Sequence, residues 1–171
     1  TEQALDHLPN IYCGVAVLLL LPMYIMNRRI GIREKAVYMA LIIFMLMGFS
    51  INVLNFIWHG LHYPNSLPAR QSYIYVFLMH YVCFRLYQKK RYVRKRELYT
   101  GLAVALGFIL LCQHTADQGQ GISFMVYYAS MLLTVLYAGL FYAFIKNRLK
   151  RSTIGLLALC LVCIEAAGNT A

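Results

Sequence analysis

The chain has 171 residues, of which 61% are hydrophobic and only 13% are charged. A soluble domain of this size would have too little polar surface to cover itself, so the composition excludes that class and indicates a membrane protein. The formal net charge of +10 does not indicate a nucleic-acid partner, because membrane topology and attraction to anionic lipid head groups account for the basic residues. The five cysteines lie in apolar runs, which argues against a disulfide framework.

The apolar runs predict six transmembrane helices, over residues 10–27, 36–57, 71–88, 99–116, 122–145 and 152–167. The expected fold class is therefore all-α, a polytopic transmembrane helical bundle. No repeat, linker or low-complexity segment divides the chain, which predicts a single helical domain over residues 1–171. The chain begins with Thr1 and has no signal peptide, and we expect it to be an excerpt of a longer polypeptide.

Basic residues alternate with these runs. Clusters at residues 28–35, 89–96 and 146–151 hold four, six and four of the sixteen Lys and Arg residues. By the positive-inside rule, the three short loops that carry them face the cytoplasm. The connections around residues 58–70 and 114–121 then face outward. Arg70 is the cation of the first outward connection, and the other cation outside the clusters is Arg85.

A polar stripe follows the second apolar run. Its members recur in steps of four and three and therefore share one helical face: Gly48, Asn52, Asn55, His59 and His62. For Asn52 and Asn55 an interhelical seam is the favoured explanation, because polar side chains in a bilayer need partners. The functional interpretation gains weight at the outer end, where the two histidines lie beside Trp58.

The connection over residues 58–70 combines aromatic, imidazole, amide and guanidinium groups, and Gly60, Pro64 and Pro68 impose sharp backbone changes on it. Arg70 opposes the topological charge bias, and its planar fork suits a phosphate or carboxylate. Trp58 and Tyr63 are also typical of interfacial anchors. The pair His59 and His62 is weak evidence for a metal, because too few other ligands accompany it.

The third apolar run has an aromatic face formed by Tyr73, Phe77, His80, Phe84 and Tyr87. Such a face favours packing between helices, although it is compatible with a long polyprenyl chain. His80 falls near the middle of the bilayer, where an ionisable residue normally turns inward. Glu165 near the end of the sixth run lies either within the bilayer or at its outer surface. Asn52, His80 and Glu165 are therefore candidates for an intramembrane polar site.

The string Asn-Phe-Ile-Trp-His-Gly-Leu-His-Tyr-Pro-Asn-Ser-Leu-Pro-Ala-Arg-Gln-Ser-Tyr at residues 55–73 resembles the YfhO family of bacterial polytopic membrane proteins. Members of that family carry a similar Trp-His-Gly, then Pro, then a Pro-x-Arg-x-Ser-aromatic string. Residues 8–14 and 165–169 are also similar. The resemblance implies a multi-span glycosyltransferase of the GT-C type, in the bacterial cytoplasmic membrane, of which this chain is a part.

The resemblance further implies that a sugar carried on a polyprenyl phosphate, undecaprenyl phosphate, is moved to an envelope polymer such as teichoic acid. Arg70 would then bind the lipid phosphate. Six other residues would donate hydrogen bonds, orient polar groups or stack on sugar and prenyl groups: His59, His62, Asn55, Asn65, Trp58 and Tyr63. The catalytic acid of GT-C enzymes belongs to a first outer loop outside this fragment, so the catalytic residue stays unassigned. No cofactor follows from the residues, and a divalent metal, although compatible with the reaction, is not indicated.

Two other functions remain open. A transporter or flippase for a lipid-linked substrate would use Asn52, His80 and Glu165 to line a polar pathway, but the paired interrupted spans typical of transporters are not evident. A noncatalytic membrane scaffold would use the segment 58–70 only to dock another protein.

Overall fold

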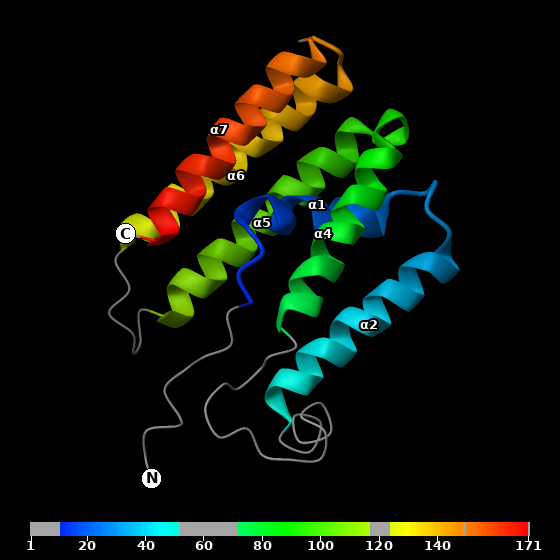
Figure 1. The fold of residues 1–171 in the computed structure, drawn as a ribbon, viewed down its shortest axis with the longest axis vertical. Coiled ribbons are helices and arrows are strands. Elements are labelled where there is room, and N and C mark those ends of the chain that lie inside the picture. The colour runs from blue at the N-terminus through cyan, green and yellow to red at the C-terminus, as the bar shows by residue number, and fades with distance from the viewer. Residues whose placement is uncertain (1–10, 52–71, 117–123, 149, 171) are drawn as a thin grey trace. The chain divides into compact units, whose positions relative to one another are not determined.

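The structure is a computed structural model that describes residues 11–51, 72–116, 124–148 and 150–170. Regular structure in these ranges is entirely helical and includes no strand, which confirms the expected all-α class. The helices are α1 (Val15–Met26), α2 (Ile32–Ser50), α4 (Ser72–Gln88), α5 (Lys95–Ala116), α6 (Phe124–Ile145) and α7 (Arg151–Thr170), with a short 3-10 helix η1 (Lys90–Tyr92) before α5 (Figure 1).

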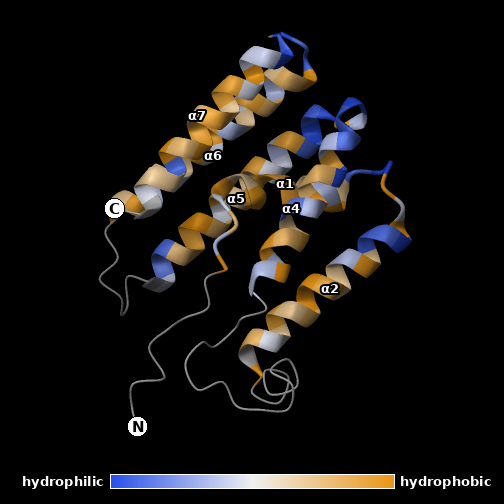
Figure 2. Cartoon of the chain, viewed as in Figure 1, coloured by the Kyte–Doolittle hydropathy of each residue, from blue (hydrophilic) through white to orange (hydrophobic). Residues whose placement is uncertain are grey.

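Three of the described helices are long and apolar enough to cross a membrane, namely Lys95–Thr115 in α5, Phe124–Ile145 in α6 and Arg151–Gly168 in α7. Large apolar side chains remain exposed along them; Leu111 is 66%, Met125 78% and Ile164 61% exposed. Helices with apolar residues on their outer faces are stable in lipid rather than in water. Figure 2 shows hydrophobic residues along α6 and α7 and hydrophilic residues just after α6 and at the start of α7. The fold is a helical membrane bundle.

α1 is shorter than the helix expected over residues 10–27. Residues 11–14 are not helical, and Gly14, with φ of +84°, has a backbone conformation that glycine adopts readily and other residues rarely adopt. The 12 residues of α1 extend ~18 Å, less than the ~30 Å of a hydrocarbon core. α2 ends at Ser50, followed by an extended Ile51, whereas the expected helix continued to residue 57. α4 to α7 agree with the expected ranges to within about one helical turn at each end.

The chain divides into two compact units, residues 1–13 with 30–84 and residues 14–29 with 85–171. The expectation of a single domain stays a prediction. In the first unit, α2 and α4 run in opposite directions and pack through two aromatic pairs. The ring centroids of Tyr38 and Tyr81 are 5.3 Å apart, and those of Phe49 and Tyr75 are 5.8 Å apart.

In the second unit, α1 packs against α5 and α6, α5 packs against α6, and α6 packs against α7. α1 and α5 approach closely at Gly101, where an added Cβ would lie 2.7 Å from Met23 Cγ and 3.0 Å from the Leu19 carbonyl oxygen. Ala105, one turn along α5, is also buried. Small residues spaced four apart allow two helices to approach in this way within a membrane.

Replacing Gly101 by Val is expected to destabilise the protein by about 1–3 kcal/mol, because the added atoms would overlap buried atoms of α1. The matched control is Gly107→Val on the same helix, where nothing lies within 4 Å of the added Cβ. Thermal unfolding in detergent measures both variants. A Gly101 variant as stable as its control would contradict the close packing of α1 on α5.

Candidate functional site

The substrate-binding residues predicted from the sequence lie outside the described residues. They are Asn55, Trp58, His59, His62, Tyr63, Asn65 and Arg70, and Asn52 of the predicted intramembrane site lies there too. Their roles therefore stay predictions. In the chain, Arg70 precedes α4 and the basic cluster at 89–96 follows it. α4 has 17 residues, so a helix ~26 Å long lies between these two charged regions of the sequence.

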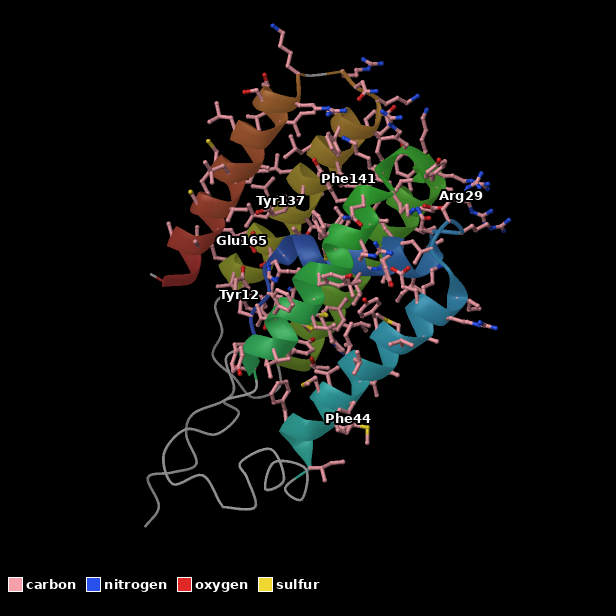
Figure 3. The ribbon with its side chains drawn as sticks, turned by 45° about the vertical axis from the view of Figure 1, so that its right-hand side comes forward. Tyr12, Arg29, Phe44, Tyr137, Phe141 and Glu165 are labelled. Atoms are coloured by element: carbon pink, nitrogen blue, oxygen red, sulfur yellow. The ribbon has the colours of Figure 1, made fainter. Side chains whose placement is uncertain are left out.

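Glu165 of α7 is buried in the second unit, with only 8% of its surface exposed. Both carboxylate oxygens accept hydrogen bonds. The hydroxyl of Tyr137 on α6 donates to Oε2 at 2.6 Å, and the backbone N–H of Val15 at the start of α1 donates to Oε1 at 2.5 Å. Figure 3 shows Tyr137 and Glu165 on the neighbouring helices α6 and α7. We call Glu165, Tyr137, Gly14 and Val15 the Glu165 node.

The Glu165 node has a simple electrostatic basis. The first N–H groups of a helix have no partner within the helix and carry partial positive charge. No side chain caps α1 from its own N-cap position, Gly14, and the Glu165 carboxylate from α7 takes that place. The bond from the Tyr137 hydroxyl to the other oxygen of Glu165 ties α6 to the same side chain. The node therefore joins three helices, and its carboxylate acts as an acceptor that positions them.

His80 is exposed, and its Nδ1 lies 2.8 Å from the carbonyl oxygen of Val76 on its own helix. Tyr73 and Phe77 of the same aromatic face are each 70% exposed. His80 belongs to the first unit and Glu165 to the second. The predicted intramembrane site of Asn52, His80 and Glu165 therefore stays a prediction, while Glu165 has a described set of partners.

The basic segments of the second unit meet at one end. The Arg29 guanidinium, just after α1, lies 5.0 Å from the ring centroid of Tyr92. Lys90, the first residue of η1, has its Nζ 3.5 Å from the ring centroid of Phe144 near the end of α6. The first basic cluster thus meets the second, and the second meets the end of α6 just before the third. The side of the membrane on which they lie stays a prediction.

A second buried carboxylate organises this basic end. Glu97 is 6% exposed and Asn27 is fully buried, and the Asn27 side-chain amide donates to Glu97 Oε2 at 3.3 Å. The backbone N–H of Arg94 donates to the same oxygen at 3.5 Å. Asn27 Oδ1 in turn accepts the backbone N–H of Arg29 at 2.9 Å. Glu97 therefore caps α5 and fixes the turn after α1.

The comparison with known families decides the identity of the chain. The model of the bacterial membrane protein family YfhO matches residues 1–171. The chain belongs to the YfhO family. Neither a curated protein nor a solved structure matches it. The match confirms the resemblance drawn from residues 55–73 and identifies this YfhO chain as a bacterial membrane protein.

Three structural partners in this YfhO chain did not stand out in the sequence. Glu97 lies directly after a cluster of basic residues, although its position three after Arg94 has the spacing of a helix cap. Asn27 and Tyr137 carried no pattern of their own, and Tyr137 is one of 14 tyrosines. Among the residues that the structure describes, no group of three or more His, Cys, Asp or Glu residues is placed to hold a metal ion.

Proposed function

We propose that this YfhO-family chain is part of a membrane glycosyltransferase that moves a sugar from a polyprenyl-phosphate carrier to a cell-envelope polymer at the outer membrane face. The main support is the family match over residues 1–171 together with the string at residues 55–73. In the reaction, the bond between the anomeric carbon and the lipid phosphate breaks. A hydroxyl oxygen of the polymer forms the new bond and gives its proton to a base.

The arrangement of the basic segments supports the topology that this reaction needs. α5 begins and α6 ends beside the basic end of the second unit, so their other ends lie one helix length away. If the basic end faces the cytoplasm, as the positive-inside rule requires, those other ends face outward. Alternation along the chain assigns the segment 58–70 to the same outer side, where a lipid-linked sugar and an envelope polymer would meet.

Arg70 has the chemistry that the leaving group requires. Negative charge grows on the phosphate oxygens as the bond to the sugar breaks, and a preorganised cation that is stronger in the transition state lowers the barrier. A guanidinium presents two parallel N–H donors to a phosphate. His59 or His62 would add a hydrogen bond, and the rings of Trp58 and Tyr63 would stack on sugar or prenyl groups.

We assign Glu165 to positioning rather than to proton transfer. Its two oxygens accept hydrogen bonds from the Val15 N–H of α1 and the Tyr137 hydroxyl of α6, so the side chain holds these two helices against α7. The resemblance places the catalytic acid in a first outer loop, outside residues 1–171. The base that accepts the polymer's proton would therefore come from another part of the protein.

The proposal is tested with purified full-length protein in liposomes that contain a radiolabelled polyprenyl-phosphate sugar and an acceptor polymer. Label on the polymer supports glycosyl transfer. Movement of the intact donor across the bilayer without product would instead indicate a flippase. Absence of both would leave a scaffold role and refute the proposed transfer.

A further inference from the structure

The basic end of the second unit contains an ammonium group held on two aromatic rings. The rings of Tyr87 and Phe144 are stacked, with centroids 5.4 Å apart and planes inclined by 11°. Lys90 Nζ lies 3.5 Å from the Phe144 centroid and 5.3 Å from the Tyr87 centroid. Cation–π attraction to two rings fixes the position of a side chain that would otherwise be free to move in solvent.

Two further cations from different parts of the chain act on this ammonium group. The pKa of Lys90 is lowered from its ordinary value because the ammonium is partly removed from water and because Arg151 and Arg91 repel it. Glu97, the acid at this end, is buried and bonded to Asn27 and to the Arg94 backbone. Within the described part of the chain, no carboxylate therefore neutralises these three cations.

The apolar surface next to these cations decides which anion suits them. Arg151 is the first residue of α7, and Leu159 and Val162, eight and eleven residues further along the helix and nearest to its face, have 60% and 52% of their surfaces exposed. α7 is long and apolar enough to span a membrane. A ligand at this place would meet positive charge at the helix end and an apolar surface along the helix. Free phosphate would satisfy only the first of these two features.

We propose that Lys90, Arg91 and Arg151 bind the phosphate head group of an anionic membrane phospholipid, whose acyl chains lie along α7. A bound phosphate would neutralise the mutual repulsion of the three cations by charge-assisted hydrogen bonds. General attraction of basic loops to an anionic leaflet acts on every Lys and Arg at the surface. The proposed site differs because Lys90 is held on the ring pair of Tyr87 and Phe144, and because Arg91 and Arg151 act on the same ammonium group. It does not depend on the proposed transfer reaction.

The test is a titration of the purified full-length protein in detergent with phosphatidylglycerol, followed by native mass spectrometry. The variant is the double substitution Lys90→Gln and Arg151→Gln. Its matched control is Arg94→Gln with Arg96→Gln, which removes the same charge from the same basic end. The first pair is expected to weaken lipid binding by roughly 10-fold or more, and the control pair by less than about 3-fold.

Equal losses in the two double variants would show general charge attraction and overturn the site, as would the absence of any loss. Lys90→Arg keeps the charge and is expected to keep lipid binding; a loss as large as that of the double variant would also contradict the proposal. Phosphatidylcholine should not bind at the same concentrations. Displacement of the bound lipid by millimolar inorganic phosphate would mean that the site takes free phosphate instead.

Discussion

Replacing Arg70 by Gln is expected to reduce sugar transfer by at least ~100-fold, the usual effect of removing one donor that stabilises charge in a transition state. Gln keeps a hydrogen-bond donor but loses the positive charge and the two-pronged geometry that match a leaving phosphate. The loss should appear in kcat/KM for transfer from a polyprenyl-phosphate sugar in liposomes. Membrane insertion, measured by the amount of protein extracted with the membrane fraction, should not change.

Arg85→Gln is the matched control, since Arg85 is the other cation outside the three basic clusters. Its guanidinium donates to Gln88 Oε1 at 2.9 Å on its own helix. Transfer by this variant should stay close to that of the unaltered protein. Unchanged turnover after Arg70→Gln, or an equal loss in both variants, would remove Arg70 from the site.

Replacing Glu165 by Ala is expected to destabilise the protein by about 2–4 kcal/mol, because two buried donors lose their acceptor. These are the Val15 N–H and the Tyr137 hydroxyl, both of which donate to this carboxylate. Tyr137→Phe removes only one of the two bonds and should cost about 1–2 kcal/mol. Thermal unfolding of the purified protein in detergent measures both effects.

Ile164→Ala provides the control for Glu165. Ile164 precedes Glu165 on α7 but is 61% exposed, so its truncation should change stability little. A Glu165→Ala variant that unfolds like the unaltered protein would contradict the positioning role. If such a stable variant also lost sugar transfer, Glu165 would belong to the reacting site.

The long apolar helices were predictable from the sequence for a physical reason. In lipid, every backbone N–H and C=O must be satisfied within the chain, so an apolar run long enough to span must be helical. α6 and α7 follow that rule closely. The helix predicted over residues 10–27 is shorter than expected. It begins only after Gly14, which adopts a φ of +84°, whereas the sequence alone suggests a helix through this residue. The sequence does not show whether a glycine within an apolar run will adopt a positive φ.

The burial of Glu165 shows what the sequence could not provide. Its sequence position is equally compatible with a group inside the bilayer and with one at the outer surface. The choice depends on Tyr137, 28 positions away, and on the first N–H of α1, 150 positions away. Such partners are fixed by helix packing and have no local pattern. The family, in contrast, could be predicted from residues 55–73, because that resemblance depends on a local string of residues and not on helix packing.

The outward orientation of residues 58–70 is the condition on which the proposed transfer rests. A cysteine introduced by Ser66→Cys, after replacement of the five native cysteines, is treated with a membrane-impermeant maleimide on intact spheroplasts. A second variant, Ser152→Cys beside the third basic cluster, provides the opposite reference. We expect position 66 to react in intact spheroplasts and position 152 to react only after permeabilisation. Labelling of position 66 only from the interior would contradict an active site at the outer face.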